Sequence, residues 1–178
     1  SAQNEGVIYL VVKDNSGEKQ VTPVSAESQK EKPVVQETPV YQEEVKPDSV
    51  RITDPIKAAA IENFFQRYSS SNKEGLVEEL TSLYTDPSFY ITRSYSRNQL
   101  RKIISDFFGR TRTTEHYFTN LVAYELENGE ISAYVSETQE TYDYTYNKNS
   151  KASVYKNFHL IPTNDGYKCA AQYQLAYR

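Results

Sequence analysis

The hydrophobic pattern changes period near Gly109, and this change constrains the fold more than any other feature of the sequence. Before Gly109, apolar residues recur at the helical spacing of about 3.6 residues. After Gly109 they alternate, which is the pattern of strands with one buried face. The dipeptide Asn128-Gly129 interrupts this alternation and is a strong signal for a tight hairpin. The sequence therefore predicts an α+β fold in which helices precede an antiparallel sheet.

Three turns set the register of the predicted sheet, at Asn128-Gly129, at 147–150 and at 163–166. If the first loop has two residues and the other two have four, one face of four strands becomes overwhelmingly apolar. We expect this face to pack on the helices. Its members are Phe118, Val122, Tyr124, Leu126, Ile131, Ala133, Val135, Ala152, Val154, Phe158, Leu160, Tyr167, Cys169, Ala171, Tyr173, Leu175 and Tyr177.

The same register places a group of tyrosines on the opposite face, with Tyr155 directly across from Tyr142. The group consists of Tyr117, Tyr134, Tyr142, Tyr144, Tyr146 and Tyr155. Part of this pattern reflects the general preference of Tyr for strands. A platform for single-stranded nucleic acid or glycan is a second interpretation, but no cluster of basic residues surrounds the rings. We favour a third, a protein-contact surface, because Tyr is enriched at interfaces.

Polar residues interrupt the apolar face, and buried charges need partners or a wet cavity. With the aromatic residues near them they predict the lining of a pocket between helices and sheet. The expected lining is Phe65, Tyr68, Phe107, His116, Phe118, Asn120, Glu137, Gln139, Lys156, Phe158 and Tyr173. His116 and Glu137 could act as a general base and its orienting partner. They could equally be a satisfied polar pair without a catalytic role.

Three helices are predicted before the sheet, each from its start signal. Asp54 followed by Pro55 is typical of an N-cap and a first helical residue. Capping boxes, in which Ser is followed three residues later by Glu or Gln, mark the other two starts at Ser71–Glu74 and Ser96–Gln99. Gly109 is expected to end the third helix.

The first fifty residues differ in composition from the rest. They contain four of the seven prolines and no Phe, and their nine acidic and five basic residues account for the whole net charge of −4. Residues 21–50 combine Pro with Glu, Lys, Gln and Ser, so they bury too little apolar surface to offset their ordering entropy. We predict a tether at 21–50 and a folded domain at 51–178. Residues 1–20 could form a short hairpin around Asn15-Ser16-Gly17.

Charge and motifs argue against several functional classes. A net charge of −4 and a pI near 5.3 disfavour a nucleic-acid binder. No apolar run approaches the roughly 18–20 residues that span a bilayer, so a membrane link is expected only through an upstream segment. No motif indicates a metal or cofactor, and we expect neither. The single cysteine, Cys169, excludes an internal disulfide and is expected in the core.

Four stretches carry a resemblance to a known family: "AAAIENFFQRYSS", "LVEELTSLYTDPSFYI", "SRNQLRKIISDFF" and "GYKCAAQYQLAY". In this order, from about Asp54 to Tyr177, they resemble the nuclear-transport-factor-2-like superfamily, which includes the SnoaL-like cyclases. The resemblance implies a cone-shaped domain: three N-terminal helices packed on a curved antiparallel meander of four or more strands. It also implies a pocket and frequent dimerisation through the outer sheet face. It does not imply one function.

Two functional hypotheses follow, and we favour the first. It is a non-catalytic binding or assembly module, tethered through 21–50 to an upstream segment, that meets a protein partner or a second copy of itself through the tyrosines. The alternative uses the pocket to bind a small hydrophobic ligand or to perform acid/base chemistry. A second alternative is a periplasmic assembly subunit of a type IV secretion system, because such subunits share the fold and follow an anchor and a tether. The missing Met and the tether favour an exported protein, periplasmic or at the cell surface.

Overall fold

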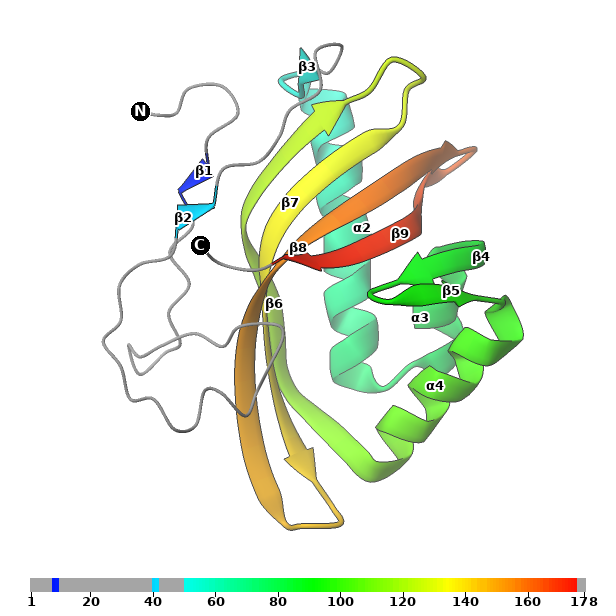
Figure 1. The fold of residues 1–178 in the computed structure, drawn as a ribbon, viewed down its shortest axis with the longest axis vertical. Coiled ribbons are helices and arrows are strands. Elements are labelled where there is room, and N and C mark those ends of the chain that lie inside the picture. Colours follow the sequence, from blue (N-terminus) through cyan, green and yellow to red (C-terminus); the bar gives the residue numbers. More distant parts are fainter. Residues whose placement is uncertain (1–7, 10–39, 42–49, 176–178) are drawn as a thin grey trace.

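The structure is a computed structural model that describes residues 8–9, 40–41 and 50–175. Seven strands form one sheet in the order β3-β6-β7-β8-β9-β4-β5, and three helices lie on its concave side (Figure 1). The strands are β3 (Val50–Arg51), β4 (Tyr84–Tyr90), β5 (Arg93–Tyr95), β6 (Thr111–Glu125), β7 (Ile131–Asp143), β8 (Lys148–Thr163) and β9 (Gly166–Leu175). The helices are α2 (Pro55–Glu74), α3 (Val77–Ser82) and α4 (Arg97–Arg110). The predicted α+β class and its curved antiparallel meander are confirmed.

The sheet is larger than the four-stranded meander of β6, β7, β8 and β9. β4 pairs in parallel with β9, β5 pairs with β4, and β3 pairs with the C-terminal end of β6. Two further strands, β1 (Ile8–Tyr9) and β2 (Val40–Tyr41), pair with each other. β1 lies in the predicted hairpin region and β2 in the predicted tether, so this pairing joins the two regions. The predicted turn at Asn15-Ser16-Gly17 lies outside the described residues.

The helix starts follow their sequence signals at two of three places. The Asp54 side chain accepts a hydrogen bond from the backbone N–H of Ile56 at 3.2 Å and caps α2. Ser96 and Gln99 form the full capping box of α4. The predicted start at Ser71 is wrong, because α2 runs through Ser71, buries it and ends only at Gly75, which adopts a left-handed conformation with φ 67°.

The predicted end of the third helix at Gly109 is also wrong, by a short distance. α4 continues through Gly109 to Arg110. The Thr111 backbone N–H and hydroxyl both donate to the carbonyl oxygen of Phe107, so Thr111 satisfies the helix end without a left-handed glycine.

The β6–β7 turn has one residue more than the two-residue loop expected at Asn128-Gly129. The Leu126 N–H bonds to the Glu130 carbonyl at 2.8 Å, and Gly129 has φ 86°. The extra residue exchanges the faces of the adjoining part of β6. Val122 and Tyr124 therefore lie on the outer face, opposite Tyr134 and Ser132, and not on the apolar face as predicted.

A β-bulge in β6 restores the predicted faces further along the strand. Asn120 and Leu121 together oppose Val135, and Asn120 adopts φ 56°. Beyond the bulge, Phe118 lies opposite Glu137. The inner face of this half of β6 is therefore the one that the sequence indicates.

The β7–β8 turn lies three residues earlier than predicted, at 144–147. The Asp143 side chain accepts hydrogen bonds from the backbone N–H groups of Thr145 and Tyr146 and so begins the turn. Tyr155 consequently faces Ser136 and not Tyr142. The pairing changes by an even number of residues, so the inner and outer faces of both strands are kept.

Another bulge separates the two ends of β9. Leu160 pairs with Cys169 as predicted, but His159 pairs with Ala171, which shifts the register by one residue. Gln172 thereby turns to the inner face opposite Phe158, and its side chain is completely buried. Tyr173 and Leu175 turn to the outer face, in contrast to the prediction.

Aromatic rings form the centre of the core between α2 and the sheet. Phe158 is fully buried and its ring centroid lies 5.0 Å from that of Phe65, 5.6 Å from Tyr68 and 5.8 Å from Phe118. All three ring contacts are edge-to-face, which is a preferred geometry for aromatic pairs. In the described part of the chain, none of the helices has the length and apolarity needed to span a membrane.

Candidate functional site

A cavity of about 380 Å³ lies between α4 and the inner face of the sheet. All three helices and strands β4, β7 and β8 contribute to its wall. The lining consists of Tyr68, Asn72, Leu80, Tyr84, Tyr90, Leu100, Ile103, Ile104, Asp106, Phe107, Phe108, Arg110, Glu137, Gln139 and Lys156. The wall is thus mainly aromatic and aliphatic, with a few polar side chains, which is the usual composition of small-molecule sites.

The polar side of the cavity is built around Glu137 on β7. One carboxylate oxygen lies 2.6 Å from Nζ of Lys156, and the other lies 2.6 Å from Nε2 of His116. The opposite ring nitrogen of His116, Nδ1, lies 2.7 Å from the Ser69 hydroxyl. An ionised carboxylate can only accept, so Nε2 donates to Glu137 and Nδ1 can accept the Ser69 proton. Both ring nitrogens of His116 are therefore occupied by protein partners.

The chain of polar contacts continues from Lys156 to two tyrosines. Lys156 Nζ donates to the side-chain carbonyl oxygen of Gln172 at 2.6 Å. The side-chain NH₂ of Gln172 donates to the hydroxyl of Tyr84 at 3.0 Å and to that of Tyr68 at 3.3 Å. The two phenol oxygens are 2.9 Å apart. A continuous hydrogen-bonded path therefore crosses the core from Ser69 on α2 to Tyr84 on β4, and its members hold one another in fixed positions.

Electrostatics fixes the charges of the central pair. Burial alone would raise the pKa of the Glu137 carboxyl, but the Lys156 ammonium and the His116 hydrogen bond lower it to about 2. Burial opposes the charge of Lys156, but the attraction of Glu137 outweighs it and raises the pKa of Lys156 above its ordinary value. Burial raises the pKa of Tyr68 and Tyr84 well above their usual range. Both residues of the ion pair are therefore charged near neutral pH, and both phenols are neutral.

The structure divides the predicted pocket residues between several places. Tyr68, Phe107, Glu137, Gln139 and Lys156 line the cavity. A second hollow, on the α2–β6 side of the domain, is lined by the further predicted residues Phe65, His116, Phe118 and Asn120.

The remaining two predicted pocket residues line neither of these hollows. Phe158 is in the dry core, fully buried between aromatic rings. Tyr173 is 41% exposed on the outer face, because of the bulge in β9, and its ring lies beside Phe89 on β4.

Several important residues of the site were not predicted. Gln172 is missing from the predicted inner face, because nothing local in the sequence marks the bulge in β9. Tyr84 and Tyr90 reach the cavity because β4 pairs in parallel with β9, a long-range contact that no turn signal announces. The helical stripe of α4 indicates from the sequence alone that Leu100 and Ile104 face inward, but it does not show that they line a cavity.

The predicted tyrosine surface is smaller than the six residues expected. Tyr155 has no exposed surface and lies beside Tyr134, so it is not accessible to a partner. Tyr142 is half-buried and donates to Asn147 at 2.5 Å. Tyr117 and Tyr134 are also half-buried.

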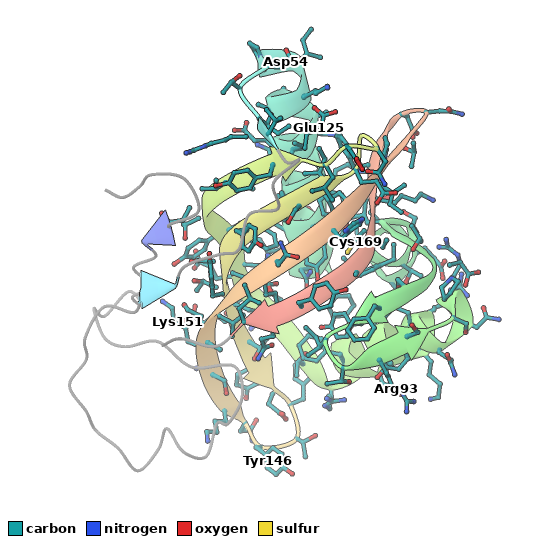
Figure 2. All side chains as sticks on the ribbon, turned by 45° about the horizontal axis from the view of Figure 1, so that its top comes forward. Asp54, Arg93, Glu125, Tyr146, Lys151 and Cys169 are labelled. Carbon is teal, nitrogen blue, oxygen red and sulfur yellow. The ribbon has the colours of Figure 1, made fainter. Side chains whose placement is uncertain are left out.

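Only two of the six predicted surface tyrosines are well exposed, Tyr144 at 52% and Tyr146 at 74%. Both occupy the β7–β8 turn and not the strand itself. Figure 2 shows Tyr146 at the end of this hairpin, with Lys151 further along β8. These two residues are the part of the predicted contact surface that a partner could reach.

Neither cysteine nor metal chemistry is indicated in the described part of the chain. Cys169 is buried, its thiol donates to the Ala171 carbonyl, and burial raises its pKa to about 12. The thiolate that nucleophilic chemistry needs is therefore not formed near neutral pH. No group of three or more His, Cys, Asp and Glu side chains converges among the described residues.

Comparison with known proteins identifies the fold. No protein-family model and no curated protein matches the chain. Among solved structures, ActVI-ORFA from Streptomyces coelicolor has a TM-score of 0.55 at 12% identity, covering 67% of this chain and 96% of that one. Aln2 from another Streptomyces species has a TM-score of 0.58 at 9% identity, covering 70% and 93%. A protein from Catenulispora acidiphila in complex with S-DNPA has a TM-score of 0.57 at 17% identity, covering 68% and 93%.

The chain has the nuclear-transport-factor-2-like fold. At identities this low, structural likeness shows the fold alone, and the fold hosts several functions. The function must be inferred from the site. In this domain the site is an apolar cavity with a buried ion pair, Glu137 and Lys156, on one wall.

Proposed function

We propose that this domain binds a small, largely apolar molecule in the cavity between α4 and the sheet. The observation that carries the proposal is the combination of an aromatic and aliphatic wall with one buried, hydrogen-bonded ion pair, Glu137 and Lys156. The volume of about 380 Å³ lies within the range of roughly 300–1,000 Å³ that is common for ligand pockets. The C. acidiphila protein of the same fold was solved in complex with S-DNPA, and this precedent supports a ligand site.

The charges favour binding over acid/base catalysis. A general base works best with a pKa near the working pH, whereas the pKa of Glu137 is about 2 and that of Lys156 is raised. Both ring nitrogens of His116 are engaged, by Ser69 and by Glu137, and neither is left to accept a proton from a bound molecule. A raised Lys pKa also disfavours a Schiff base, which needs the neutral amine.

A substitution that blocks the entrance of the cavity tests the proposal. Ile103 on α4 is 38% exposed and lines the cavity, so Ile103→Trp should fill the entrance without disturbing the core. Lys102→Trp is the matched control, because Lys102 is the neighbouring residue and its side chain is 76% exposed. With 2-ethylnaphthalene as probe, we expect NMR shift changes for cavity residues in the wild type and the control, and at least tenfold weaker binding in Ile103→Trp. Equal binding by all three proteins would place the ligand elsewhere.

A second candidate function is protein contact through the β7–β8 turn. Tyr144 and Tyr146 are exposed although the turn that carries them is fixed by the Asp143 side chain and by the Tyr142–Asn147 hydrogen bond. Exposed tyrosines on a fixed turn are suited to an interface, because Tyr supplies a large contact area at low cost in conformational entropy. Such a surface could serve an assembly role with a partner or a second copy.

Sedimentation of the full chain tests this second function. If the turn joins two copies, the wild type should show a concentration-dependent increase in mass that Tyr144→Ser/Tyr146→Ser abolishes. Tyr117→Ser, on β6, is the control and should leave the mass unchanged. A wild type that stays monomeric at high concentration contradicts self-association through this turn.

Export from the cytoplasm and a role as a periplasmic assembly subunit of a secretion system stay predictions. They rest on the composition of residues 21–50 and not on the cavity. Fractionation of the producing cells, with detection of the chain in each fraction, tests them. Recovery from the cytoplasm alone would contradict both.

A further inference from the structure

The Lys156 ammonium group can donate one more hydrogen bond than the described residues accept. Its ammonium group has three N–H donors. Nζ lies 2.6 Å from an oxygen of the Glu137 carboxylate, and it donates a hydrogen bond to the side-chain carbonyl oxygen of Gln172. No third acceptor is found among the described residues, although Lys156 is only 6% exposed and lines the cavity. One N–H of a buried cation is thus available to a molecule in the cavity.

The aromatic neighbour of Lys156 does not replace that third acceptor. The ring centre of Tyr90 lies 5.9 Å from Nζ, at the outer limit of a cation–π contact. An oxygen in the cavity would give a much stronger interaction, because hydrogen bonds from a charged donor are about twice as strong as neutral ones.

The net charge of the cluster decides which kind of oxygen fits. Within the buried pair, the charge of Lys156 is already balanced by the Glu137 carboxylate. A carboxylate or phosphate beside Lys156 would add an uncompensated negative charge to a buried site, which is costly. The rim offers no net compensation, because it contributes one acidic residue, Asp106, and one basic residue, Arg110. An uncharged acceptor satisfies the free N–H without that cost.

Around this donor the cavity offers mainly apolar surface. Leu100, Ile104, Phe107 and Phe108 from α4 face the sheet across the cavity. A ligand that matches this arrangement has an apolar body and a single uncharged oxygen acceptor at one end.

We propose that the ligand is an uncharged molecule with an apolar body and one carbonyl-type oxygen, which accepts the free N–H of Lys156. This inference rests on the proposed function, because it names the chemical class of the ligand for the same cavity. It adds a specific role for Lys156, which donates to the acceptor, and for Glu137, which balances the charge of Lys156 and so disfavours an anion.

Three probes of nearly equal shape test the inference on the full chain at neutral pH. They are 2-acetylnaphthalene, which carries a carbonyl; 2-ethylnaphthalene, which lacks an acceptor; and 2-naphthoate, which carries a charge. We expect the ketone to bind roughly ten- to hundredfold more tightly than the hydrocarbon, and the carboxylate to bind most weakly. Binding constants from NMR titration decide the order.

The outcomes separate this inference from the function on which it rests. If the hydrocarbon binds as tightly as the ketone, and Ile103→Trp blocks both, the cavity binds ligands but Lys156 does not select them. If the carboxylate binds most tightly, the site is an anion site and the inference is wrong. If none of the three binds, both the inference and the proposed function fail.

Variants of the ion pair provide an independent readout. Lys156→Met alone could unfold the domain by leaving Glu137 unpaired, so the double variant Glu137→Leu/Lys156→Met is the main test. It should bind the ketone and the hydrocarbon equally. Lys151→Met, on the same strand but not lining the cavity, should keep the full preference for the ketone.

The carbonyl stretching frequency of the bound ketone reports the hydrogen bond directly. Acceptance of an N–H from Lys156 lowers this frequency relative to the ketone in an apolar solvent. We expect the shift in the wild type and in Lys151→Met, and its loss in the double variant. A bound ketone with an unshifted carbonyl in the wild type would overturn the inference.

Discussion

Tyrosines inside the cavity and tyrosines of the β7–β8 turn are the same residue type in opposite settings. Tyr68 and Tyr84 are almost fully buried, and their hydroxyls bond to each other and to Gln172. The rings of Tyr144 and Tyr146 project from a turn that is held by the side chains of Asp143 and Asn147. The neighbours of a tyrosine ring, and not the residue type, therefore determine whether the ring stabilises the fold or is exposed for contact with another molecule. Substitutions in the two regions should therefore differ sharply in cost.

The largest effect is expected at the cation of the cavity. Lys156→Met leaves the buried Glu137 carboxylate without its cation and with only the His116 hydrogen bond, and it should lower the free energy of unfolding by about 3–5 kcal/mol. Urea unfolding followed by circular dichroism measures this. The double variant Glu137→Leu/Lys156→Met should recover most of the loss, because two buried charges disappear together. A loss in Lys156→Met no larger than that of a turn variant would show that the pair is not buried in solution.

Acid should weaken the fold through the Glu137 carboxyl of the cavity. The folded pKa of Glu137, about 2, is below its ordinary value of 4.5, so its contribution to stability is complete above the ordinary value and is lost as pH falls towards 2. We expect the free energy of unfolding to decrease between pH about 5 and about 3 in the wild type. The double variant Glu137→Leu/Lys156→Met should lack this component. Identical pH profiles for the two proteins would contradict the assignment.

A smaller effect is expected where the turn is fixed. Asp143→Ala removes the acceptor for the N–H groups of Thr145 and Tyr146 and should cost about 1 kcal/mol. Asp143→Asn keeps the acceptor oxygen and should cost much less. Thermal unfolding of the three proteins compares them, and equal melting temperatures would show that the turn does not depend on this side chain.

The smallest effect on stability is expected for Tyr146→Ser. The ring is 74% exposed, and the change should stay within about 0.5 kcal/mol. The same urea titration used for Lys156→Met provides the measurement. A cost above about 2 kcal/mol would remove the contrast between the two regions, because it would mean that this ring is buried in solution.

Local signals in the sequence predicted the fold class because they are independent of distant contacts. Asp54, Ser96 and Gln99 cap helices whatever the sheet does, and the alternation in β7 and β8 defines two faces without knowledge of the exact pairing. For the same reason Glu137, Gln139 and Lys156 could be placed on the inner face before their partners were known. His116 falls on the same face in the predicted register, which brings it near Glu137.

The parts that could not be predicted depend on single-residue irregularities and on distant pairing. One extra turn residue moved Tyr124 to the outer face, and the bulge in β9 exchanged Gln172 for Tyr173 at the inner face. Both changes have energies set by packing across the whole sheet, which no short window of sequence contains. The parallel pairing of β4 with β9, which brings Tyr84 to Gln172, is of the same kind.

The turn and the bulge of β6 also have a consequence for how this chain can change in length. The longer turn moves the strand by one residue, and the bulge at Asn120 and Leu121 moves it back, so His116 and Phe118 face the core. Deleting one residue at either place alone would turn His116 and Phe118 outward and bring Tyr117 inward. Deleting one at each place would leave them where they are. Among relatives of this chain, single-residue gaps in the turn and in the bulge should therefore be inherited together.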